Sequence, residues 1–206
     1  MKYIFPAVFF FLLALPVPVQ AEEAAPKTII EDQAEADLLL GQHLFTENSL
    51  ANDGFIFDYE EFSPIIIRSN NGKYQISGEH ICYYRNPRYP SYADGGYVRL
   101  NGTITKISPM GFTVKGRFEY FYDDDIYNKD ERPEKYRYIE NCKKDGVFRF
   151  SRKGHPKYWR LQNAGKICAG QGSMYLADIF TKQLLGDAPQ RVCTKDLNRV
   201  FDLPIP

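Results

Sequence analysis

The chain has 206 residues, and its 26 basic side chains are balanced by 26 acidic ones. This balance excludes the basic surface by which nucleic-acid-binding proteins attract phosphates, so no nucleic acid is expected as a partner. The length suits a single domain that buries a sizeable core.

Residues 1–21 have the pattern of a cleaved signal peptide. Lys2 gives a positive start, residues 4–15 form an uncharged apolar run, and residues 19–21 (VQA) suit a signal peptidase. The apolar run is shorter than the roughly 20 residues that a spanning helix needs. We therefore expect a periplasmic or secreted protein that begins at Glu22 and has no membrane span in its mature chain.

The mature chain is predicted to have three parts. Residues 22–37 form a leader and a short helix, since Glu31 to Leu40 contains Ala, Glu and Leu but no Gly or Pro. A single β-domain is expected over residues 38–180, where apolar and polar residues alternate with the period of a strand. An irregular, disulfide-tethered tail is expected over residues 181–206.

Turn signals divide the β-domain into hairpins. Asn71-Gly72 predicts a type I′ turn between strands 64–70 and 73–84. Residues 108–111 (SPMG) predict a type I turn between strands 97–107 and 112–122. Asp145-Gly146 predicts a turn between strands 136–144 and 147–151. Further strands are expected at 157–162, after a turn at 154–156, and at 174–180.

Three glycines interrupt the apolar faces of these strands. Gly78, Gly102 and Gly116 each lie within a predicted strand, where a glycine usually marks a bend or a close approach of two backbones. Bends of this kind allow a sheet to curl. The fold class is therefore all-β, a small antiparallel meander closed or half-closed into a barrel.

The loop over residues 85–96 suggests a binding site. Tyrosines and arginines, the residue types enriched at recognition hot spots, alternate in and just before it. Tyrosine rings that cap one end of the barrel would explain the same pattern equally well. The candidate ligand-binding residues are Tyr83, Tyr84, Arg85, Arg88, Tyr89 and Tyr92.

Metal sites receive little support, and no metal or other cofactor is expected. His80 and Cys82 share one strand face, but a closed zinc site needs four ligands and no spaced partner pair exists. Residues 123–134 partly fit a calcium loop, although Tyr127 and Asn128 stand where the loop needs an oxygen ligand and a glycine. A solvated acidic loop is the simpler interpretation.

Catalytic motifs are also absent from the sequence. No serine lies in a G-x-S-x-G element. His43 or His155 could meet a serine in space, but the sequence does not show such a meeting. No catalytic residue is assigned, and a non-enzymatic protein is expected.

Several motifs resemble those of a group of exported bacterial β-proteins of uncharacterised function. Between Cys142 and Cys168 the chain reads GVFRF at 146–150 and KYWRLQ at 157–162. GQHLF at 41–45, NGKY at 71–74 and LNGTITKI at 100–107 extend the likeness over residues 41–180. The chain differs from that group at residues 154–156, in having Cys82 and Cys193, and in its C-terminal tail. The resemblance implies a β fold and supplies no activity.

A second resemblance concerns the fold alone. A short helix followed by a strand is similar to the start of lipocalin-type barrels, but residues 41–43 read GQH where those proteins have G-x-W.

The four cysteines of an exported chain predict two disulfides. Cys142 and Cys168 lie almost equidistant from the turn near Gly154, so they should meet at one end of a hairpin, and the resembling group has cysteines at these two points. Cys82 and Cys193 would then pair and hold the tail against the barrel. The alternative is Cys82 with Cys142 and Cys168 with Cys193.

The leading hypothesis is an exported non-enzymatic binding protein whose ligand is a protein, a glycan or a small apolar molecule. Its site would lie at the end of the barrel that bears residues 83–97. One alternative is a periplasmic hydrolase or envelope-modifying enzyme that uses a histidine. Another is an inhibitor of a cell-wall enzyme.

Overall fold

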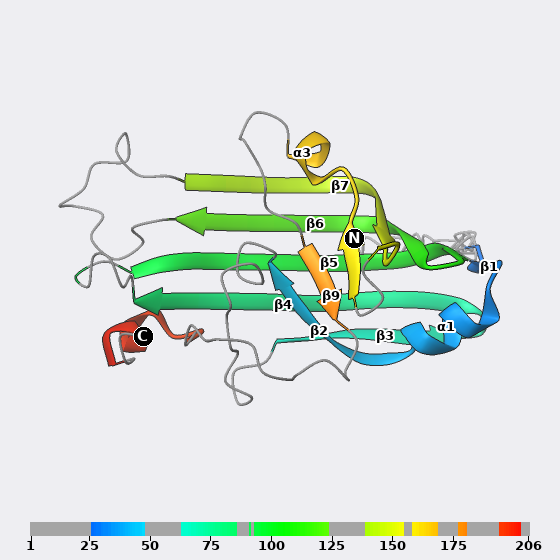
Figure 1. Ribbon diagram of the computed structural model, residues 1–206, viewed down its shortest axis with the longest axis horizontal. Helices are drawn as coiled ribbons and strands as arrows, with labels where there is room; N and C mark the ends of the chain where they lie inside the picture. Colours follow the sequence, from blue (N-terminus) through cyan, green and yellow to red (C-terminus); the bar gives the residue numbers. More distant parts are fainter. Residues whose placement is uncertain are drawn as a thin grey trace, which may run out of the picture.

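The computed structural model describes residues 26–47, 63–85, 91, 93–123, 139–154, 158–168, 177–180 and 194–202 (Figure 1). The predicted signal peptide lies outside these ranges. The described strands are β1 (Ile29–Ile30), β2 (Gly41–Glu47), β3 (Pro64–Asn70), β4 (Lys73–Arg85), β5 (Ala93–Ser108), β6 (Gly111–Asp123), β7 (Ile139–Ser151), β8 (Tyr158–Leu161) and β9 (Ala177–Phe180). The helices are α1 (Gln33–Leu39), α3 (Ala164–Ile167) and the 3-10 helix η3 (Leu197–Asp202).

All the described strands belong to one curled sheet, which forms a half-barrel. Strand pairing passes from β5 through β4, β3, β2, β9, β8 and β7 to β6, which pairs with β5 again. Every neighbouring pair in this series is antiparallel, and only β1 adds a parallel pairing, on β5. The predicted all-β antiparallel meander, closed or half-closed into a barrel, is confirmed, and the sheet forms a half-barrel.

The strands differ in length, and this gives the barrel two unlike ends. β4 to β7 have 13 to 16 residues, whereas β2, β3, β8 and β9 have four to seven. We call the part where the short strands pair with the long ones, beside α1, the closed end. We call residues 79–85, 93–99, 119–123 and 139–143 the extended end. Figure 1 shows α1 and η3 at opposite ends of the long strands.

The core lies on the inner face of the sheet. It consists of the residues that the predicted alternation of apolar and polar side chains assigns to the buried face. On β6, for example, Phe112, Val114 and Phe118 are buried while Lys115 and Arg117 are exposed. Other strands contribute the buried side chains Ile65, Ile67, Tyr74, Ile76, Leu100, Ile104, Phe148, Phe150, Trp159, Leu161 and Ile179.

The turn predictions have mixed outcomes. Asn71 and Gly72 both have positive φ, at 51° and 76°, as a type I′ turn requires. At residues 108–111 the predicted type I turn is wrong, because Met110 has a φ of 64°. A positive φ at the third residue of a turn whose second residue is proline is typical of a type II turn.

The predicted turn at Asp145-Gly146 is also wrong. β7 runs through this dipeptide without a break, and the residues on both sides of it pair with β6. Gly146 lies opposite Gly116, which lies opposite Gly102 on β5. A Cβ atom on Gly102 would come within 2.6 Å of the Lys115 carbonyl oxygen. Gly146 therefore lies in the middle of a strand, where an added Cβ would meet only the Phe148 ring at 3.8 Å, and it does not reverse the chain.

The loop predicted over residues 85–96 is shorter than expected. β4 continues to Arg85 and β5 already begins at Ala93. Gly95, with a φ of 142°, makes this extension possible, because a Cβ there would meet the Cys82 carbonyl and lie 2.8 Å from Tyr83 Cα. The extra pairs lengthen the extended end.

Candidate functional site

Adjacent candidate residues of β4 point to opposite faces of the sheet. Tyr84 is buried on the inner face, where it pairs with Asp94 of β5. Tyr83 lies on the outer face in a small cluster with Ala93, Phe121 and Leu197 of η3. The six residues therefore do not form one continuous surface. Arg85 ends β4 and is half-buried, whereas Arg88, Tyr89 and Tyr92 lie outside the described residues.

The C-terminal segment pairs with the edge of β4 at the extended end. Thr194 and Tyr83 exchange two backbone hydrogen bonds, of 2.8 and 2.9 Å, and η3 packs beside β4. Burial raises the pKa of the Tyr83 hydroxyl, and Tyr97 raises it further. Tyr83 is thus part of a structural contact with the tail.

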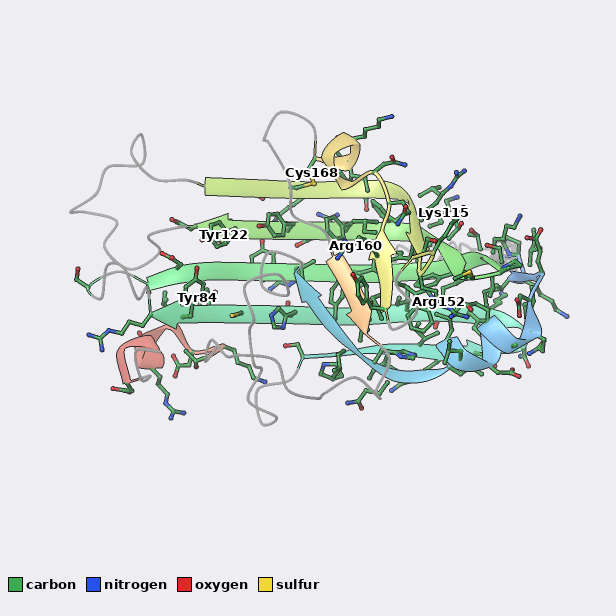
Figure 2. All side chains as sticks on the ribbon, in the orientation of Figure 1. Tyr84, Lys115, Tyr122, Arg152, Arg160 and Cys168 are labelled. Carbon is green, nitrogen blue, oxygen red and sulfur yellow. A yellow bond between two sulfur atoms is a disulfide. The ribbon has the colours of Figure 1, made fainter. Side chains whose placement is uncertain are left out.

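The inner face of the extended end carries a different set of side chains from the rest of the core. Cross-strand register places them in rows: Tyr84 with Asp94, Cys82 with Gly96 and Tyr122, and His80 with Val98, Tyr120 and Cys142. Figure 2 shows Tyr84 and Tyr122 at the end of the sheet away from Arg152. Two buried polar groups, His80 and Asp94, therefore share one face with three tyrosines.

His80 is an uncharged side chain in this environment. It is only 3% exposed, and burial lowers its pKa from 6.5 to about 4. At neutral pH the imidazole can donate one hydrogen bond and accept another. A pKa this far below neutrality makes His80 a poor general base, which works best when its pKa is near the working pH.

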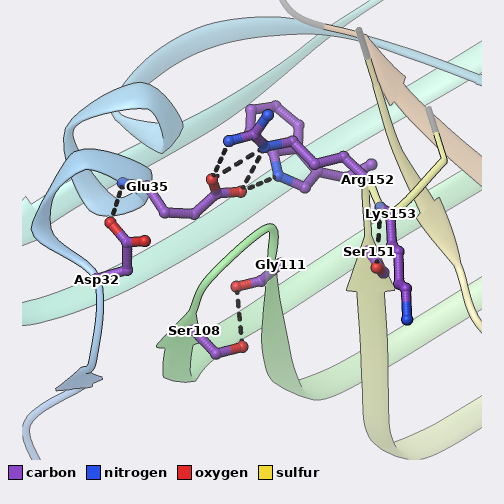
Figure 3. Close-up of polar contacts among 8 residues, drawn as sticks. Asp32, Glu35, Ser108, Gly111, Ser151, Arg152 and Lys153 are labelled. Carbon is purple, nitrogen blue, oxygen red and sulfur yellow. Dashed lines mark hydrogen bonds and ion pairs between the residues drawn. The ribbon is translucent and has the colours of Figure 1, made fainter. Parts of the chain in front are cut away.

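A polar cluster that the sequence did not reveal lies at the closed end, around Glu35 of α1. Its carboxylate, in a residue only 2% exposed, accepts a hydrogen bond of 2.6 Å from Trp159 Nε1. Arg152 donates to the same carboxylate from Nε at 2.9 Å and from Nη2 at 2.7 Å (Figure 3). Asp32 caps the helix by accepting from Glu35 N at 3.0 Å. These bonds fasten α1 to β8 and to the residue that follows β7.

His43 packs against this cluster and has a structural position. Its Nε2 lies 2.8 Å from the Leu39 carbonyl oxygen, and its ring meets Trp159 edge-on at 5.3 Å. Burial lowers its pKa, although the hydrogen bond to Leu39 works in the opposite direction. His155, the third histidine, lies outside the described residues. His43 therefore contributes to the packing of the closed end.

The described residues include only part of the two candidate metal sites. Cys82 is disulfide-bonded, so its sulfur is not a thiolate that could share a zinc ion with His80. Of the calcium-loop segment, Asp123 ends β6 and residues 124–134 lie outside the described part. Within the described ranges, no group of three or more His, Cys, Asp or Glu side chains could hold a metal ion.

The predicted bridge between Cys142 and Cys168 is confirmed, with Cα atoms 5.6 Å apart. The hairpin on which the prediction rested is short, because β8 pairs with β7 only at Phe150 and Ser151. The chain then turns at Asn163, with a φ of 57°, and α3 brings Cys168 to Cys142. Cys193, the predicted partner of Cys82, lies outside the described residues.

Among the described residues, no helix has the length and apolar composition needed to cross a bilayer. Comparison with curated proteins and with solved structures gives no match. A family model does match, over residues 27–180, which include all of the described strands. The chain therefore belongs to the PM1083 family, an uncharacterised family.

Proposed function

We propose that the protein is an exported binding protein that takes a small ligand, with an apolar body and polar groups, at the extended end of the half-barrel. The observation that carries this proposal is the change of side chains along the inner face. Toward the closed end the rows contain Ile, Val, Leu, Phe and Trp together with Tyr74. At the extended end they contain His80, Tyr84, Asp94, Tyr120 and Tyr122.

The chemistry of these side chains suits such a ligand. Tyrosine offers a ring face and a hydroxyl, and ligand sites in barrels are mostly apolar surfaces with a few placed polar groups. The neutral imidazole of His80 and the carboxyl group of Asp94 supply polar groups of different kinds on the same face. Polar groups placed in this way among tyrosine rings can address the polar groups of a ligand while the rings contact its apolar body.

Export is supported by two features. Residues 1–21 have the signal-peptide pattern, and the disulfide between Cys142 and Cys168 suits an oxidising compartment. The GVFRF and KYWRLQ motifs between these cysteines add the resemblance to exported bacterial β-proteins. The periplasm or the cell exterior is therefore the proposed location.

The test is a thermal-shift screen of the purified mature protein with a set of small hydroxylated aromatic compounds. A ligand that binds only the folded state raises the melting temperature by mass action. Tyr84→Phe and Asp94→Asn should reduce that rise. Tyr74→Phe, on the same strand and the same face but toward the closed end, is the matched control and should keep it.

Two outcomes would contradict the proposal. One is that no compound raises the melting temperature of the wild-type protein. The other is that Tyr74→Phe removes the rise as fully as Tyr84→Phe does, because the ligand would then not depend on the extended end.

A further inference from the structure

Residues 143–147 of β7 form an exposed edge of the sheet, which we call the β7 edge. All five are exposed, and Val147 is 60% exposed. β6 pairs with β7 along one side, whereas β8 reaches only Phe150 and Ser151 on the other. Figure 1 shows β7 at the margin of the four long strands. A strand edge of this kind can pair with another extended chain.

The backbone of the β7 edge points its hydrogen-bonding groups outward at alternate residues. Gln162 N donates to Arg149 O at 2.8 Å, on the side of β7 away from β6. Because main-chain groups alternate along a strand, those of Lys143, Asp145 and Val147 face the same way. Among the described residues, no backbone hydrogen bond outside the β6–β7 ladder uses them.

The acidic side chains near the β7 edge already have basic partners. Glu119 of β6 accepts from Arg117 at 2.7 Å and lies 4.0 Å from Lys143. Asp145 lies 3.6 Å from Arg117. Glu119 and Asp145, the two acidic side chains next to the β7 edge, are therefore already matched by basic side chains.

Three exposed basic side chains on or beside the β7 edge have no such partner. Lys144 lies on the edge itself. Lys115 of β6 pairs with Val147, and Arg149 lies two residues beyond Val147 on β7. Within the described part of the chain, none of the three forms an ion pair. The edge therefore carries an excess of positive charge beside its outward backbone groups, with Val147 as an apolar contact between them.

We propose that the β7 edge binds an extended, acidic segment of a partner protein by adding it as a further strand. Backbone hydrogen bonds to Lys143, Asp145 and Val147 would hold the segment, and its carboxylates would lie on the outer face near Lys115 and Arg149, while Lys144 projects from the opposite face. A second copy of this chain fits less well, because it would bring the same excess of positive charge against itself. This site is distinct from the ligand site at the extended end and does not depend on it.

The experiment measures fluorescence anisotropy of three labelled peptides with the mature protein. The first alternates Glu and Val, the second alternates Lys and Val, and the third has the charge of the first but proline in place of valine. The Glu-Val peptide should bind at least about tenfold more tightly than either of the others. It alone combines acidic charge with a backbone that can donate and accept hydrogen bonds as a strand.

Two variants of Val147 separate strand addition from simple charge attraction. Val147→Pro removes the outward N–H group without touching the ladder to β6, and should weaken binding of the first peptide about tenfold. Val147→Ala keeps that group and is the matched control, with little change expected. If Val147→Pro does not fold, Lys115→Glu with Arg149→Glu, two changes on the outer face, serves instead and should abolish binding.

The proposal is overturned if the Glu-Val peptide does not bind, if the proline peptide binds equally well, or if Val147→Pro binds as the wild type does. It is also overturned if sedimentation shows that the protein dimerises through this edge and that Val147→Pro dissociates the dimer. A negative thermal-shift screen at the extended end leaves these outcomes unchanged.

Discussion

The two ends of the half-barrel bury polar groups in contrasting ways. At the closed end, Glu35 is surrounded by donors from Arg152 and Trp159, and these bonds join a helix to residues more than a hundred positions away in the chain. At the extended end, His80 is buried and uncharged among tyrosines, and a separate small cluster under η3 covers the outer face. The polar cluster of the closed end joins a helix to the sheet, whereas the buried polar groups of the extended end share the face where we propose that a ligand binds.

The largest expected effect is at Glu35. Glu35→Ala leaves the Arg152 guanidinium and Trp159 Nε1 without their acceptor, and breaking a buried pair of this kind costs about 3–5 kcal/mol of unfolding free energy. Asp37→Ala, an exposed change on the same helix, should cost less than about 0.5 kcal/mol. Urea unfolding of both variants measures the difference, and equal losses would mean that the cluster does not hold the closed end.

His80 should make the extended end sensitive to acid. The pKa of His80 is about 4 in the folded protein and near 6.5 in the unfolded protein. Between these two pH values the unfolded state is protonated at His80 and the folded state is not. Stability should fall by roughly 3 kcal/mol between pH 7 and pH 4 from this group. His43 contributes in the same direction.

The His80→Gln variant isolates this contribution. Its free energy of unfolding should depend less steeply on pH between 6.5 and 4 than that of the wild type, as urea titrations at several pH values can measure. An unchanged slope would show that His80 is not the buried, neutral group described above.

The smallest effect is expected under η3. Leu197→Ala removes part of the outer cluster with Tyr83 and should cost about 1 kcal/mol, because this cluster is separate from the main core. Hydrogen exchange of the Tyr83 and Thr194 amides should accelerate while amides of β6 near Val114 keep their protection. Faster exchange at both places would mean that the tail supports the whole barrel.

Much of the fold could be predicted because it depends on local patterns. The alternation on β6 identified Phe112, Val114 and Phe118 as core residues, and Asn71-Gly72 identified its turn. Asp145-Gly146 misled because a glycine can occupy the middle of a strand as well as a turn, and only the register with Gly116 distinguishes the two.

The polar contacts were much harder to predict from the sequence. Glu35 and Trp159 are 124 residues apart, and nothing local to either predicts their meeting. A signal did exist at Asp32 and Glu35, whose spacing fits a helix N-terminus, but it indicates a cap and not a buried ion pair. For Tyr83 and Tyr84, strand alternation alone could have shown that neighbours in a strand face opposite sides.

The most direct test of the contrast between the two ends is a map of backbone amide shifts, recorded by NMR while a compound from the thermal-shift screen is added. We expect the shifts to concentrate at residues 80–84, 94–98 and 120–122, and the Trp159 indole signal to stay in place. Shifts centred on Glu35 and Trp159, with the extended end unchanged, would contradict it.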